Sequence, residues 1–155
     1  LGYGEDTHRL VAGRPLVLGG VTIPFHLGLL GHSDADALAH AAMDAMLGAC
    51  ALGDIGKLFP DTDPQYAGIC SLTLLTQVLR RTLAQGYALS NLDATIVAQQ
   101  PKLAPHIPAM RAKLAAAMAC GQERISIKAT TPEGCGPEGA LESITVRCVC
   151  SMEAI

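Results

Sequence analysis

The spacing of apolar residues along the chain predicts a domain that mixes strands and helices. Apolar and polar residues alternate over residues 92–98, 125–129 and 144–150, the pattern of strands with one buried face. Residues 16–18 and 21–23 flank a Gly-Gly pair, and this arrangement predicts a tight β-hairpin. The interleaving of these strands with helical segments indicates a mixed α/β fold.

Three segments have the apolar spacing of amphipathic helices. We expect the first to begin at Ser33 as its N-cap and to run to about residue 47, which places His40 about two turns after the start. The second follows Ser71, which we expect to be its cap, and stops at Gly86. Its apolar face is predicted to hold Leu72, Leu75, Val78, Leu79 and Leu83. The third runs from residue 105 or 108 to residue 120, before a glycine.

Residues 52–68 form a long segment without periodicity, rich in Gly, Asp and Pro. Structureless loops longer than about 12–15 residues in compact domains are usually functional or disordered. We therefore expect this loop to serve the function of the chain, although a solvated turn region would have a similar composition.

Composition limits the class of protein further. The chain has 155 residues, which we interpret as one domain over residues 1–155. Half of the residues are hydrophobic, 16% are charged and 3% are aromatic, so the core must be aliphatic and part of the apolar surface is expected to contact another subunit. The net charge of −3 without a basic run argues against nucleic acid as a partner.

No apolar stretch reaches the length of a membrane span, so we expect no membrane partner. The six cysteines lack zinc-finger spacing, and we interpret them as reduced thiols of a cytosol-like compartment. Two of them, Cys148 and Cys150, are two residues apart in a predicted strand, which indicates that both face the core.

Candidate chemistry lies near the start of the chain. Asp6 and His8 are two apart in a strand-like run, so both point to the same face. With His40 they give one carboxylate and two imidazoles, a set that suits zinc and leaves a fourth position open for catalysis. Taken alone, such residues are more often ordinary strand and helix positions than ligands. Asp36 and Asp44 lie four residues either side of His40, and each either orients its imidazole or lies on the helix surface.

Four segments together resemble the 2-C-methyl-D-erythritol 2,4-cyclodiphosphate synthase family. They are HSDAD at residues 32–36 with His40, ALGDIGKLFPDTD at 51–63, AQQPKLAPHI at 98–107, and KATT at 128–131. The resemblance covers nearly the whole chain. It implies a mixed sheet covered on one side by helices, in a homotrimer that places the sheets around its inside and the active sites between subunits. A bacterial cytoplasm, or a plastid stroma in a eukaryote, is the implied location.

The resemblance also implies the reaction. The substrate would be 4-diphosphocytidyl-2-C-methyl-D-erythritol 2-phosphate, whose 2-phosphate attacks the β-phosphorus, closes a cyclic diphosphate and expels CMP. It implies zinc bound by Asp6, His8 and His40, and a second divalent cation, magnesium or manganese, bound by Glu133. Because the nucleophile is already a charged phosphate, metals and positioning are expected to carry the catalysis.

Residue by residue, the resemblance implies that His32 and Thr131 stabilise charge in the transition state. The methylerythritol end of the substrate would be held by one set of residues, namely Ser33, Asp54, Gly56, Phe59, Asp61 and Asp63. The cytidine and diphosphate end would contact a second set, namely Ala98, Lys102, Leu103, Ala104, Thr130, Thr131 and Glu133. Asp6, His8 and His32 would also contact the substrate.

The sequence departs from the family pattern after Thr131. Pro137 and Ala140 stand where the family usually has Phe and Arg, and Glu5 stands where it usually has an aromatic residue. Related trimers hold an isoprenoid diphosphate in a central cavity with the help of that Arg. Arg147, predicted to lie on the strand face opposite Ile144, Val146 and Cys148, either replaces the lost cation, abolishes such binding, or is an ordinary surface residue.

Two other functions fit parts of the same pattern. A phosphohydrolase would use the zinc to activate water, but no clear base for that water is visible. A trimeric binding module would keep the fold and lose catalysis through the altered segment 132–141. A cytidylyltransferase domain upstream of Leu1 is a further hypothesis.

Overall fold

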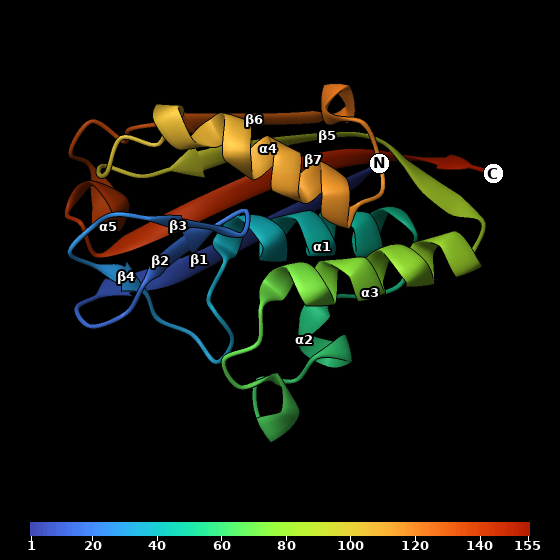
Figure 1. Cartoon of the computed structure of the whole chain (residues 1–155), viewed down its shortest axis with the longest axis horizontal. Coiled ribbons are helices and arrows are strands. Elements are labelled where there is room, and N and C mark those ends of the chain that lie inside the picture. The colour runs from blue at the N-terminus through green and yellow to red at the C-terminus, as the bar shows by residue number, and fades with distance from the viewer.

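The computed structural model describes residues 1–155 and contains one five-stranded mixed sheet with helices on one face (Figure 1). Its strands lie in the order β4-β1-β7-β5-β6, and only β5 and β6 are parallel. The bounds of the sheet strands are β1 Gly2–Val11, β4 Gly28–Leu29, β5 Tyr87–Val97, β6 Ile125–Thr130 and β7 Ser143–Ala154. A separate hairpin consists of β2 Leu16–Leu18 and β3 Val21–Ile23. The predicted fold class is confirmed.

Three long helices cover the sheet: α1 Ala37–Ala49, α3 Ser71–Ala84 and α4 Ile107–Ala117. Helix α1 packs on β1 and β7, α3 packs on α1, and α4 packs on β6 (Figure 1). Two short helices, α2 Ile55–Leu58 and α5 Gly136–Gly139, lie in connections, as do 3-10 turns at Pro64–Tyr66, Ala104–His106 and Gln122–Arg124. None of the helices has the length and apolar run that crossing a lipid bilayer requires.

The strand predictions hold, although β5 and β7 are longer than the alternating patterns indicated. The side chains of Ile144, Val146, Cys148 and Cys150 all enter the core, as predicted. Burial raises the pKa of Cys150 to about 11, so its thiol stays protonated at neutral pH. The Gly19-Gly20 turn of the hairpin has positive φ at both residues, 59° and 74°, which explains the need for glycine.

The predicted starts of two helices were wrong, because each serine has another partner. Helix α1 begins at Ala37, and its N-cap is Asp36, whose carboxylate accepts from the backbone N–H of Ala39. Ala35, with φ of 58°, is not helical, and Ser33 accepts from its backbone N–H instead. Consequently His40 lies about one turn after the helix start rather than two.

Ser71 is the first residue of α3 rather than its cap, and its hydroxyl turns toward His40. The predicted stop at Gly86 holds: the helix ends at Ala84 and Gly86 has φ of 85°. The buried face of α3 differs in part from the prediction, since Leu74 is buried and Leu83 is exposed. Helix α4 ends three residues earlier than predicted, at Ala117.

Helix α1 lies directly against the backbone of β1. A β-carbon on Gly2 would overlap the carbonyl oxygen of Ala45, and one on Gly4 would overlap that of Ala41. Every residue of α1 from Ala37 to Met43 is buried, which such close approach requires. The two strand glycines therefore set the distance between the element that carries Asp6 and His8 and the element that carries His40.

This contact predicts opposite effects for two glycine-to-alanine substitutions. Gly4→Ala places a methyl group against the α1 backbone and should lower the free energy of unfolding by about 1–3 kcal/mol. The control Gly48→Ala lies in α1, where the nearest atom to an added β-carbon is 3.9 Å away, and should raise stability by up to about 1 kcal/mol. Urea denaturation followed by circular dichroism measures both. Equal effects of the two substitutions would contradict the close packing.

Candidate active site

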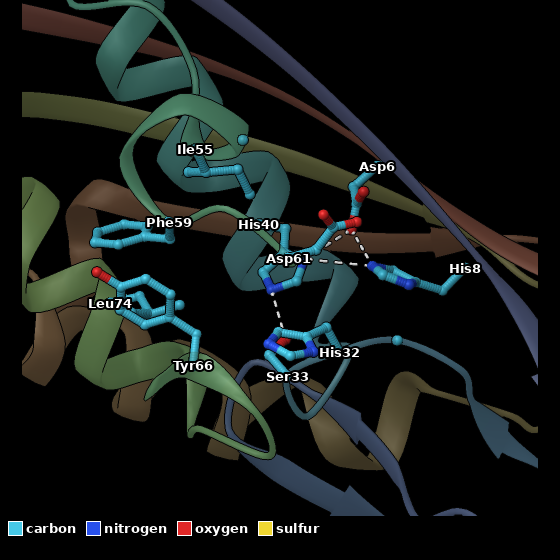
Figure 2. Close-up of a pocket in the computed structure, with 12 residues that line it drawn as sticks. Asp6, His8, His32, Ser33, His40, Ile55, Phe59, Asp61, Tyr66 and Leu74 are labelled. Atoms are coloured by element: carbon cyan, nitrogen blue, oxygen red, sulfur yellow. Dashed lines mark hydrogen bonds and ion pairs between the residues drawn. The ribbon is translucent and has the colours of Figure 1, made fainter. Parts of the chain in front are cut away.

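Asp6, His8 and His40 converge on one point, as the family resemblance implied (Figure 2). Asp6 Oδ2 lies 2.7 Å from His8 Nε2 and 3.1 Å from His40 Nδ1, and the two imidazole nitrogens are 3.3 Å apart. Asp6 and His8 come from one face of β1, and His40 comes from the first turn of α1. One carboxylate oxygen and two nitrogens directed at one point are a donor set that fits a zinc ion with an open position.

The opposite nitrogen of each imidazole has its own partner. His8 Nδ1 lies 2.8 Å from the backbone carbonyl oxygen of Leu30. His40 Nε2 lies 2.9 Å from Ser71 Oγ and 3.3 Å from Ser33 Oγ. Each ring therefore has a hydrogen-bond partner for the nitrogen that points away from Asp6, which is the usual arrangement of histidines that bind metals.

The two acidic residues near His40 in sequence do not orient it. Asp36 is fully buried, so it does not lie on the helix surface. Its carboxylate bonds backbone N–H groups and not the His40 imidazole. Besides capping α1, its carboxylate accepts from the backbone N–H groups of Gly19 and Gly20 at 2.9 and 2.7 Å. Asp44 is half-buried and accepts from the backbone N–H of Ile55, which ties α1 to α2. Both acids hold neighbouring elements in place.

The charge of the site suits a cation. Burial by itself would raise the pKa of Asp6, but the imidazoles of His40 and His8 beside its carboxylate outweigh this effect and lower the pKa to about 2. Burial opposes the charged form of His8, yet the bond to Asp6 leaves the pKa of His8 raised. Asp6 is thus ionised at neutral pH, as a metal ligand must be.

A cavity of about 340 Å³ opens beside the three residues, and we call it the metal cavity (Figure 2). Its twelve lining residues are Asp6, His8, Gly31, His32, Ser33, His40, Ile55, Gly56, Phe59, Asp61, Tyr66 and Leu74. The long loop predicted to be functional supplies one wall of it. In that wall the rings of Phe59 and Tyr66 pack edge to face, with centroids 5.4 Å apart.

Two predicted substrate contacts lie outside this lining. Asp54 caps α2 by accepting from the backbone N–H of Lys57, and it is exposed. The Asp63 carboxylate bonds Gln65, while its backbone carbonyl oxygen lies 2.8 Å from His32 Nε2. Sequence reasoning missed Tyr66 and Leu74, because neither belongs to a polar motif and only the fold brings them to the cavity.

The second predicted set lies at the ends of β5 and β6, away from β1. A cavity of about 200 Å³, which we call the edge cavity, is lined by Ala98, Gln99, Pro101, Lys102, Leu103, Ala104, Ala129, Thr130 and Thr131. Glu133 lies next to it, with its Oε1 3.4 Å from Thr131 Oγ1. The metal cavity belongs to β1 and the edge cavity to the ends of β5 and β6, so β7 lies between them in the sheet. The two cavities share no residue.

The uncovered face of the sheet carries Arg147, opposite Ile144, Val146 and Cys148 as predicted. Arg147 lies across from Glu5 in the β1–β7 register, and its Nε is 3.3 Å from Glu5 Oε2. Tyr3 donates to the same carboxylate oxygen. Glu5, one of the departures from the family pattern, is thus the partner of Arg147 on the uncovered face.

Comparison with known proteins agrees with this geometry. The model of the YgbB family matches residues 1–153. The 2-C-methyl-D-erythritol 2,4-cyclodiphosphate synthase of Geobacter sulfurreducens is 58% identical over 99% of this chain and 98% of its own length. The structure of bifunctional IspDF from Campylobacter jejuni matches with a TM-score of 0.96 and 40% identity, over 99% of this chain but 42% of that longer one.

A structure of 2C-methyl-D-erythritol-2,4-cyclodiphosphate synthase in a CDP-bound form matches with a TM-score of 0.90 and 43% identity, over 98% of this chain and 99% of the other. The matched residues therefore include those that line both cavities and the strands that carry them. The chain therefore belongs to the YgbB family, alongside the 2-C-methyl-D-erythritol 2,4-cyclodiphosphate synthases that it resembles along its whole length.

Proposed function

We propose that the protein is a phosphorus–oxygen lyase of the non-mevalonate isoprenoid pathway. It cyclises 4-diphosphocytidyl-2-C-methyl-D-erythritol 2-phosphate to 2-C-methyl-D-erythritol 2,4-cyclodiphosphate and releases CMP. The observation that carries the proposal is the convergence of Asp6, His8 and His40 beside a cavity in a chain so similar to synthases of that name. The CDP-bound relative supports a cytidine diphosphate compound as the ligand.

The donor sets support two cation sites in the proposal. Asp6, His8 and His40 would hold zinc, because two imidazoles and one carboxylate match its preferred ligands. Glu133, a carboxylate beside the edge cavity, would contribute to a magnesium or manganese site shared with substrate phosphates. The bound cations would neutralise phosphate oxygens as charge shifts to the leaving group.

The protein's own residues would position the reacting groups. The nucleophile is a phosphate that is already ionised, and it is part of the same molecule as its target, so alignment rather than proton removal limits the rate. Ser33 and Gly56, in the metal cavity, would orient the methylerythritol hydroxyls together with Asp54, and the Phe59 wall with Asp61 and Asp63 would close over that end.

Charge stabilisation would come from His32 and Thr131, one in each cavity. The carbonyl oxygen of Asp63 can only accept, so the neighbouring His32 Nε2 carries a proton and the ring is held in a fixed orientation. In the edge cavity, Lys102 and Thr130 would contact the diphosphate, and Ala98, Leu103 and Ala104 would contact the cytidine.

We propose a homotrimer in which each active site forms between neighbouring subunits. In a single chain the metal cavity lies at β1 and the edge cavity at β5 and β6, with β7 between them, whereas one substrate molecule would contact both. The uncovered sheet face, with exposed Tyr3 and Val149, would lie toward the inside of the assembly. We place the protein in a bacterial cytoplasm or, in a eukaryote, a plastid stroma, where its six free thiols would remain reduced.

The reaction itself is tested by product analysis. Incubation with the cytidyl substrate and magnesium should yield cyclic diphosphate and CMP in equal amounts, and a zinc chelator should stop the reaction. His8→Ala should lower kcat/KM by more than about 100-fold, whereas the control His26→Ala, an exposed histidine outside both cavities, should leave it unchanged. Release of inorganic phosphate would instead indicate a hydrolase, and ligand binding without turnover would indicate a binding module.

The shared active site is tested by complementation. His8→Ala removes a residue of the metal cavity and Lys102→Ala removes one of the edge cavity, so each homotrimer should be inactive. Coexpressed in equal amounts, the two chains should assemble at random and recover about one quarter of the wild-type activity, because that share of interfaces combines two intact cavities. Mixed assemblies without recovered activity would contradict a site formed between subunits.

A further inference from the structure

Asp34 and Ser71 form a hydrogen-bonded chain behind His40, on the side of the ring away from Asp6. Ser71 Oγ lies 2.9 Å from His40 Nε2 and donates to Asp34 Oδ1 at 2.5 Å. The second carboxylate oxygen of Asp34 accepts from the backbone N–H of Ser71 at 3.0 Å. Ser71 is fully buried at the start of α3, so no bulk water competes for its hydroxyl.

The chemistry of these groups fixes the direction of each proton. An ionised carboxylate only accepts, so the single hydroxyl proton of Ser71 is used in the bond to Asp34. The Ser71 oxygen then has only lone pairs to offer His40, and His40 Nε2 must be the donor. A neutral His40 with its proton on Nε2 has its lone pair on Nδ1, the nitrogen that lies 3.1 Å from Asp6 Oδ2.

We propose that Asp34 and Ser71 are positioning residues that hold His40 in the tautomer with a free Nδ1 lone pair and thereby raise the affinity of the site for zinc. This inference rests on the zinc site of the proposed function. His40 differs in this respect from His8. The Nδ1 proton of His8 is fixed by the backbone carbonyl of Leu30, which no substitution removes. The tautomer of His40 depends on two side chains and can therefore be changed.

Loss of Asp34 should do more than remove a contact. Without the carboxylate, the Ser71 hydroxyl is free to donate to His40 Nε2, which favours the tautomer with its proton on Nδ1. That tautomer has no lone pair to give a metal ion until it rearranges. Ser33 Oγ is also 3.3 Å from His40 Nε2, but it already accepts from the backbone N–H of Ala35 and has no carboxylate partner to orient its proton.

The test measures the His40 tautomer and zinc affinity separately, in Ser71→Ala, Asp34→Ala and the double variant. In metal-free wild type, the imidazole ¹⁵N shifts of His40 should report a protonated Nε2, and Asp34→Ala should move them toward protonated Nδ1. Zinc affinity, measured by chelator competition, should fall about 10- to 100-fold in each single variant. In the Ser71→Ala background, Asp34→Ala should cost little more, because the chain is already broken.

Thr82→Ala is the matched control, since Thr82 is another buried hydroxyl of α3 and bonds only the carbonyl oxygen of Leu79. It should change neither the His40 shifts nor zinc affinity. Additive losses from Asp34→Ala and Ser71→Ala, or lost affinity with unchanged ¹⁵N shifts, would overturn the proposal in favour of a purely structural role. Failure of wild type to bind zinc would instead overturn the proposed metal site, and so the two ideas fail separately.

Discussion

The structure depends on the direct contact between β1 and α1. Gly2 and Gly4 leave no side chain between the strand and the helix backbone, and the next residues on the same strand face are Asp6 and His8. On the helix side, Asp36 starts α1 one turn before His40 and at the same time holds the Gly19-Gly20 turn. The position of three side chains is thus fixed by backbone packing and one buried carboxylate.

A second set of backbone contacts joins the long loop to this centre. The N–H of Gly68 donates to the carbonyl oxygen of His32, and the N–H of Asp34 donates to that of Ile69. These bonds align the end of the loop with residues 32–34 and bring the first residue of α3 behind His40. The wall formed by Phe59 and Tyr66 is therefore anchored to the segment that carries His32 and Ser33.

Patterns in the sequence were sufficient for the three long helices, for most strands and for placing Asp6 and His8 on one strand face. The spacing of Asp6 and His8 specifies one strand face, and alternation specifies the strands, because both depend only on local backbone geometry. The choice of cap was not local: Ser33, Asp36 and Ser71 are all good capping residues, and tertiary partners decided which one capped a helix. Asp34, Ser71 and Leu30 also escaped prediction as supports of the histidines, since a backbone carbonyl or a distant serine leaves no motif.

Packing of α1 on β1 brings Asp6, His8 and His40 together, and we propose that the three residues bind zinc. Diffraction data collected on either side of the zinc absorption edge, from crystals of the zinc-loaded protein, test it most directly. The account predicts one anomalous peak per chain, bound by an Asp6 carboxylate oxygen, His8 Nε2 and His40 Nδ1, with a fourth position facing the metal cavity. Zinc bound elsewhere, or through the Nε2 atom of His40, would contradict it.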